Sequence, residues 1–119
     1  MTLKNISLLL IFLIGNIAYS QNIIQGKWGN QKTGYTVEIY SKGNRFYGKI
    51  IKTEGDKTGH VLLNDIVYNE STKRYNGEVK TQSGMTARCE IEFINKNSFK
   101  LKVKKLFIQK TEIFRRTEI

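Results

Sequence analysis

Apolar and polar residues alternate with a period of two along most of the chain after residue 21. The segments 35–40, 87–93 and 99–104 show the alternation most clearly. In the second of these, Ala87, Cys89, Ile91 and Phe93 alternate with Arg88, Glu90 and Glu92. Because successive side chains of a strand point to opposite faces, each segment has one apolar and one charged face. No twelve-residue segment keeps the i, i+3, i+4, i+7 spacing of a helix, so the pattern predicts an antiparallel sheet with one wet face.

Short segments that contain Gly or Asn separate the predicted strands. Residues 42–44, 82–84 and 95–97 are such segments, and Gly and Asn tolerate the positive φ of hairpin turns. The predicted strands cover residues 23–28, 35–41, 45–53, 60–63, 66–68, 75–81, 85–94, 98–104 and 106–116. Seven to nine short strands in about 100 residues are typical of a sandwich or a small barrel. Since closure removes exposed strand edges, we expect an all-β, small antiparallel up-and-down β-barrel.

The first twenty residues have the pattern of a secretory signal peptide. Lys4 is followed by the apolar run Ile6–Ile14, and then by Ala18-Tyr19-Ser20 with small residues at the first and third positions. The apolar run is too short to span a bilayer, and no Cys stands at the cleavage position to carry a lipid anchor. We therefore expect a signal peptide at 1–20 and a single β-barrel domain at 21–119, with no membrane span, periplasmic or secreted.

Composition narrows the possible chemistry. The 119 residues include 20 Lys and Arg against 10 Asp and Glu, one Cys and one His. One thiol cannot form a disulfide within its own chain, and one Cys with one His cannot fill a tetrahedral zinc site. Cys89 lies on an apolar strand face, so we expect it to be buried. His60 alone cannot build an acid–base–nucleophile set, so we expect no enzyme, no catalytic residue, no metal and no cofactor.

Several short motifs occur in a characteristic order along the chain. They are Ile24-x-Gly26-x-Trp28, Val37-Glu38-Ile39-Tyr40, Phe46-Tyr47-Gly48-Lys49-Ile50 and the ending Thr111-Glu112-Ile113-Phe114-Arg115-Arg116. In this order and spacing the chain resembles the small exported bacterial proteins of domain-of-unknown-function family 2147, over roughly residues 24 to 116. The resemblance implies export and fold, and it implies no activity.

The chain departs from that family's pattern at four places. Gln82 stands where the family usually has Pro, and Ala87 stands where an aromatic residue is frequent. Lys104-Lys105-Leu106-Phe107 replaces a Gly-rich bend, and Phe114 replaces the usual final Trp. The family's middle hairpin corresponds here to Gly77-Glu78-Val79 with Ser83-Gly84. A site on that hairpin or on the bend would therefore be altered in this chain.

The opening Gly-x-Trp and the closing Arg also resemble those of lipocalin-type barrels. In such barrels a Trp of the first strand lies under an Arg of the last strand and closes one end. The resemblance implies a structural closure by Gly26, Trp28, Phe114 and Arg116, with cation–π attraction between the indole and the guanidinium. Arg115 is the alternative partner, on the opposite strand face.

Two surfaces are candidate binding sites. The first is the barrel interior, where apolar residues either line a pocket or fill the core. Its candidate lining residues are Phe46, Ile50, Tyr75, Val79, Ile91, Phe93, Phe99 and Leu101. The second is a basic face formed by Lys96, Lys100, Lys102, Lys104, Lys105 and Lys110, with Lys49 and Lys52 on another strand. This face either attracts anions or only keeps the sheet soluble.

These features favour binding over catalysis. We expect the exported barrel to bind a small apolar or amphipathic ligand or an anionic envelope component. The alternative is a protein-interaction or inhibitor module that uses surface loops and has no ligand cavity. Nucleic acid is not expected, because no stacking aromatic residues alternate with the lysines. The sequence does not determine an oligomeric state.

Overall fold

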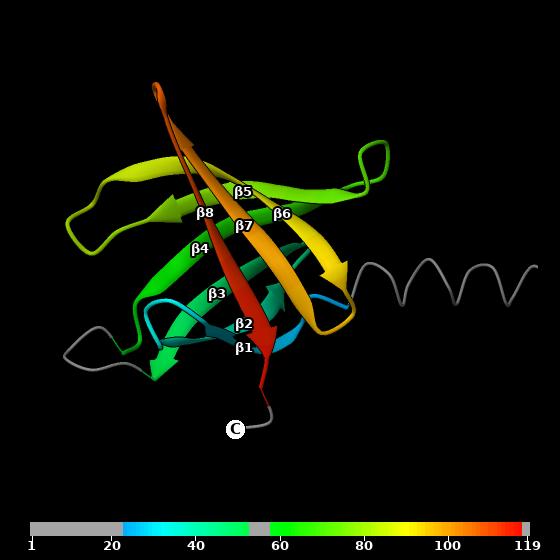
Figure 1. The fold of residues 1–119 in the computed structure, drawn as a ribbon, viewed down its shortest axis with the longest axis horizontal. Helices are drawn as coiled ribbons and strands as arrows, with labels where there is room; N and C mark the ends of the chain where they lie inside the picture. The colour runs from blue at the N-terminus through cyan, green and yellow to red at the C-terminus, as the bar shows by residue number, and fades with distance from the viewer. Residues whose placement is uncertain (1–22, 53–57, 118–119) are drawn as a thin grey trace, which may run out of the picture.

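The structure, a computed structural model, describes residues 23–52 and 58–117 and forms eight strands (Figure 1). The strands are β1 (Gly26–Asn30), β2 (Thr36–Lys42), β3 (Arg45–Lys52), β4 (Val61–Asn69), β5 (Arg74–Lys80), β6 (Thr86–Asn95), β7 (Ser98–Lys105) and β8 (Ile108–Arg116). The signal peptide predicted for residues 1–20 lies outside the described residues. Within the described residues, no helix is long and apolar enough to span a bilayer.

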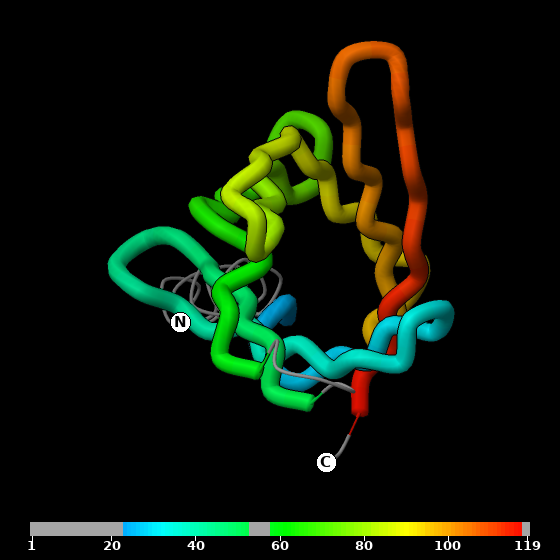
Figure 2. Tube along the Cα trace, turned by 90° about the vertical axis from the view of Figure 1, so that its left-hand side faces the viewer, coloured from blue at the N-terminus to red at the C-terminus, as the bar shows by residue number. Residues whose placement is uncertain are grey.

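The eight strands close into a barrel in which each strand pairs antiparallel with the next. The first and last strands also pair, with Trp28 opposite Arg116 and Asn30 opposite Phe114. The ring of strands is visible in Figure 2, where the trace returns from β8 to β1. The predicted all-β, antiparallel up-and-down barrel is therefore confirmed.

The boundaries of three strands differ from the prediction by more than one residue, each for a local reason. β4 is one nine-residue strand where two short ones were predicted, because a bulge interrupts its alternation. Asp65 has a φ of 54° within a register shift between Asn64 and Val67. A bulge adds one residue, so Leu63 and Ile66 are both buried although they are three positions apart.

For the other two strands, β1 and β8, the predicted ranges include residues that form turns in the structure. Ile23 and Ile24 form a turn, so β1 begins at Gly26 and extends to Asn30. Leu106 and Phe107 form the turn between β7 and β8, so β8 begins at Ile108. Both errors come from apolar residues that continue the pattern of a strand without belonging to one.

The core lies inside the barrel and is rich in aromatic side chains. Its largest fully buried members include Trp28, Tyr75, Phe99 and Phe114. Cys89 is buried among them, as predicted from its place on the apolar face of β6. The apolar face of each strand thus points inward, and the charged residues of the alternating pattern are left on the outside.

Candidate binding site

One end of the barrel is closed by the side chain of Arg116. Its guanidinium carbon lies 4.2 Å from the centroid of the Trp28 ring. The same group donates hydrogen bonds to the carbonyl oxygens of Gln25 (3.0 Å), Ile23 (2.6 Å) and Lys96 (3.3 Å). It therefore ties the segment before β1 to the turn between β6 and β7, above a buried indole.

Gly26 makes room for this arrangement. Its φ is 133°, which L side chains rarely adopt, and a Cβ placed there would lie 2.7 Å from Nη1 of Arg116. Trp28 is held from the other side, because its Nε1 donates a hydrogen bond to the carbonyl oxygen of Ile24 at 2.9 Å. Arg115, the alternative partner, is exposed. The Gly-x-Trp spacing and the final Arg thus meet in one structural unit.

Aromatic rings pack together in the interior next to this closed end. The Phe99 ring lies 4.7 Å from Trp28, 5.1 Å from Phe114 and 5.7 Å from Phe93, centroid to centroid. Tyr75 continues the cluster, 6.1 Å from Phe93 and 6.0 Å from Phe46. The rings of these strands therefore pack against one another.

The residues predicted to line an interior pocket all belong to this core. Phe93 is partly buried and packs against it, and the others are buried: Phe46, Ile50, Tyr75, Val79, Ile91, Phe99 and Leu101. Burial raises the pKa of the Tyr75 hydroxyl well above its usual range. None of the eight lines the groove described below. The structure brings them together as packing partners.

A polar cluster that sequence reasoning missed lies beside the core. The Nδ2 of the buried Asn30 donates a hydrogen bond to Glu112 Oε2 at 2.9 Å, and Asn30 Oδ1 accepts from the backbone N–H groups of Lys32 and Thr33. Burial, together with the nearby charge of Glu112, raises the pKa of Tyr35 to about 12. Glu112 shares its strand face with Phe114 and Arg116, so the alternation of β8 held the signal that this carboxylate points inward.

A groove of about 960 Å³ lies away from the Trp28 end. The start of β6 and the end of β7 line it, together with parts of the neighbouring strands and the turn before β8. Its lining residues are Arg45, Asp65, Asn76, Gly77, Glu78, Thr86, Ala87, Arg88, Cys89, Glu90, Lys102, Lys104, Lys105, Leu106 and Gln109. The lining combines five cations and three carboxylates with small and apolar residues.

Two of the five cations are paired with carboxylates of the groove. Arg45 lies 3.4 Å from Asp65, and Lys102 lies 4.0 Å from Glu90. Among the described residues, Arg88, Lys104 and Lys105 form no ion pair, although Glu78 lies opposite Arg88 in the strand register. The groove therefore carries a surplus of positive charge.

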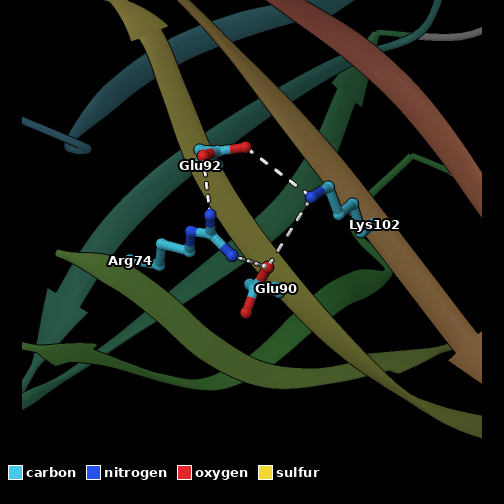
Figure 3. A network of polar contacts seen from close by, with 4 residues as sticks. All are labelled: Arg74, Glu90, Glu92 and Lys102. Atoms are coloured by element: carbon cyan, nitrogen blue, oxygen red, sulfur yellow. Dashed lines mark hydrogen bonds and ion pairs between the residues drawn. The ribbon is translucent and has the colours of Figure 1, made fainter. Parts of the chain in front are cut away.

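The carboxylates Glu90 and Glu92 are neutralised by a network on the outer face of β5, β6 and β7 (Figure 3). Arg74 lies between them, 3.1 Å from Glu90 and 3.0 Å from Glu92. Lys102 approaches the same pair from β7, at 4.0 and 3.6 Å. The alternation of β6 places Arg88 beside these glutamates, and the lysines of β7 are their other neighbours on the outer face. Lys102 does pair with them, but Arg74 takes the place of Arg88, so Arg88 forms no ion pair among the described residues.

His60 and Cys89, the two remaining residues with possible catalytic or metal-binding side chains, both have surroundings typical of structural residues. The Nε2 of His60 lies 2.6 Å from the carbonyl oxygen of Lys80. Burial raises the pKa of the Cys89 thiol to about 12, so this thiol stays protonated and is a poor nucleophile at neutral pH. In the part of the chain that the structure describes, no three His, Cys, Asp or Glu residues gather as a metal site would require.

Comparisons with protein-family models, with curated proteins and with solved structures found no match for this chain.

Proposed function

We propose that this protein is a non-enzymatic binding module whose ligand is an amphipathic anion, held in the groove beside the β7–β8 hairpin. One observation carries the proposal. Arg88, Lys104 and Lys105 line a groove of about 960 Å³ without an ion-pair partner among the described residues. Unpaired cations attract an anionic group, and in a partly enclosed groove they do so with less screening than on an open surface.

The apolar part of the ligand is suggested by the other groove residues. Gly77 of β5 and Ala87 of β6 line the groove as small residues, and Leu106 stands at the hairpin end. Ligand sites commonly combine apolar walls with a few charged groups that fix the orientation. A phosphate or carboxylate with an acyl chain matches both halves of this lining. Such molecules are components of bacterial envelopes, which agrees with the export predicted from residues 1–20.

We further propose membership of family 2147, whose motifs the chain resembles. Support comes from the eight-stranded barrel and from the contact between the residues that the opening and closing motifs supply, Trp28 and Arg116. The intact mass of the protein recovered from the periplasm or medium tests the export proposal. Loss of residues 1–20 is the expected result, and a full-length mass would contradict it.

The binding proposal is tested by calorimetric titration with two single-chain lipids below their micelle concentrations. We expect the purified protein to bind lysophosphatidylglycerol, which is anionic, and to bind zwitterionic lysophosphatidylcholine at least about tenfold more weakly. The double variant Arg88→Gln with Lys104→Gln should weaken lysophosphatidylglycerol binding by about tenfold or more.

The matched control is Lys96→Gln with Lys100→Gln. It removes the same two positive charges from residues that do not line the groove. We expect this control to bind as the parent protein does. Equal losses in the two double variants would mean that only net charge matters, and absence of binding by the parent protein would remove the proposal. A preference for neither lipid, with both bound equally, would also contradict it.

A further inference from the structure

Among the residues that the structure describes, the most exposed large apolar side chains lie at the tip of the β7–β8 hairpin. Leu106 and Ile108 are 83% and 74% exposed, and Phe107 is as exposed as in an extended peptide (102%). In Figures 1 and 2 this hairpin, orange to red, projects beyond the ring of strands. Three consecutive large apolar side chains therefore stand in solvent, away from the core.

The backbone of the tip is unusual as well. Leu106 is the first of the two residues between the paired Lys105 and Ile108, and its φ is 56°. Hairpin turns that need a positive φ at this position normally place Gly there, because a side chain with a Cβ is strained. Leu at this position does not favour the turn, so turn formation does not explain its presence. We therefore expect the Leu106 side chain to serve a contact with a molecule outside the barrel.

Lysines surround the base of the tip. Lys104 and Lys105 precede the turn on β7, and Lys110 follows it on β8, where it lies opposite Val103. Lys110 approaches Glu112 at 3.4 Å, whereas the described acidic residues form no ion pair with Lys104 or Lys105. The hairpin thus combines an apolar end with a basic collar directly behind it.

We propose that the β7–β8 hairpin tip, formed by Leu106, Phe107 and Ile108, docks this protein onto an anionic lipid bilayer. The apolar side chains enter the boundary between headgroups and acyl chains, at the depth that interfacial apolar residues reach. The collar of Lys104, Lys105 and Lys110 then lies at the level of the phosphates, where basic residues are attracted by anionic lipids.

A lipid surface fits this tip better than a protein partner or a second copy. A stable protein interface buries about 800 Å² on each partner, which is more than three side chains at a narrow tip can supply. Two copies that met at their tips would bring their lysine collars together, and like charges repel. Insertion into a bilayer needs only a small apolar element with positive charge behind it.

Docking of the hairpin tip would be a second function, which would place the proposed groove binding at a membrane. Lys104, Lys105 and Leu106 belong to both the hairpin and the groove. Docking of the tip would therefore bring the groove next to the lipid headgroups. Because Phe107 and Ile108 do not line the groove, substitutions there separate the two functions.

The test is co-sedimentation with vesicles of phosphatidylcholine that contain about one third phosphatidylglycerol, compared with vesicles of phosphatidylcholine alone. We expect the parent protein to bind the anionic vesicles at least about tenfold more tightly than the neutral ones. The variant Phe107→Ser with Ile108→Thr should lose about tenfold or more of this binding and keep lysophosphatidylglycerol binding in the groove. Leu106→Gly is a further tip variant that relieves the positive φ, so its loss of vesicle binding cannot be attributed to misfolding.

Met85→Ser is the matched control, because Met85 is 56% exposed beside the turn between β5 and β6 and stands between Gly84 and Thr86 rather than in a run of apolar residues. It should bind vesicles as the parent does. In Phe107→Trp, the new indole should shift its emission to shorter wavelength on anionic vesicles, while the buried Trp28 stays unchanged.

Unchanged vesicle binding by Phe107→Ser with Ile108→Thr would overturn the proposal, since the lysines alone would then suffice. The proposal also fails if the parent protein binds no anionic vesicles, as expected of a tip that serves a protein partner. A concentration-dependent emission shift of Phe107→Trp without lipid would overturn it in favour of a second copy. Absence of lysophosphatidylglycerol binding by the parent protein, with tip-dependent vesicle binding retained, would remove the groove proposal and support docking by the tip alone.

Discussion

The two ends of the barrel use similar residues for opposite purposes. At one end an aromatic ring and an arginine, Trp28 and Arg116, are in contact at 4.2 Å, and Arg116 also donates hydrogen bonds to three carbonyl groups. At the other end an aromatic ring and several cations, Phe107 with Lys104 and Lys105, face solvent. Packing therefore stabilises the fold at the first end, whereas the second end leaves its cationic and apolar side chains exposed to solvent.

The two ends differ because their residues occupy different positions in the sheet. Trp28 and Arg116 lie opposite each other across the strand pair that closes the barrel, so their contact joins the two ends of the sheet. Phe107 lies in the turn between β7 and β8, and the hairpin of these strands projects beyond the ring of strands (Figures 1 and 2). Residue type alone therefore does not decide between a structural and a binding role, and position in the register does.

The largest expected effect is on the buried ring. Trp28→Ala should lower the free energy of unfolding by about 3–5 kcal/mol, because it removes a large core side chain and its ring contacts. Phe107→Ala should change the same quantity by less than about 0.5 kcal/mol, as exposed positions usually do. Urea unfolding measures both variants. Similar effects at the two positions would contradict the comparison.

The next effect separates the two adjacent arginines. Arg116→Gln should cost about 2–3 kcal/mol of unfolding free energy, because it removes the cation–π contact and leaves backbone carbonyls with weaker partners. Arg115→Gln, at an exposed position, should cost less than about 0.5 kcal/mol. Thermal or urea unfolding of the two variants provides the test. A larger loss of stability in Arg115→Gln than in Arg116→Gln would refute Arg116 as the residue that closes the barrel.

Counted per pH unit, a smaller effect is expected from the titration of Cys89. Burial raises the pKa of Cys89 from 9.0 to about 12, so the folded state keeps a proton that the unfolded state loses above pH 9. Stability from this group is complete below pH 9 and is lost as the pH rises toward 12, by up to about 1.4 kcal/mol per pH unit. Cys89→Ala should make the unfolding free energy fall less steeply over this range. An identical slope in the variant would show that the thiol is not protected.

The smallest effect concerns two lysines of one strand. Lys102→Met should cost about 0.5–1 kcal/mol, because Lys102 bridges Glu90 and Glu92 in the network of Figure 3. Lys104→Met should leave stability within about 0.5 kcal/mol and instead weaken binding of lysophosphatidylglycerol. Chemical unfolding and titration of the two variants measure the difference. Equal behaviour in both assays would remove the distinction between network and groove.

Much of the fold could be predicted from the sequence because strand alternation is a local signal. The hairpins and the inward position of Cys89 all follow from a period of two and from Gly or Asn in turns. The continuity of β4 could not be predicted, because the bulge at Asp65 shifts the period within the strand. The end of β7 was set correctly to within one residue, but Leu106 and Phe107 continue an apolar pattern into the turn.

Less of the groove beside the β7–β8 hairpin could be predicted from the sequence. The basic residues Lys102, Lys104 and Lys105 were singled out as a face, but their sorting into paired and unpaired cations depends on Arg74, which lies 28 positions before Lys102 in the chain. The interior residues were identified by their alternation, which cannot distinguish a pocket from a packed core. Only the ring distances around Phe99 show that these aromatic side chains pack against one another.

The most direct test of the difference between the two ends is a titration with lysophosphatidylglycerol followed by amide and indole resonances in ¹H–¹⁵N spectra. We expect the amide resonances of the groove residues Ala87, Arg88, Lys104 and Lys105 to shift and the Trp28 indole resonance to stay in place. Shifts centred on Trp28 and Phe99, with the hairpin residues unaffected, would place the ligand in the interior and contradict the account.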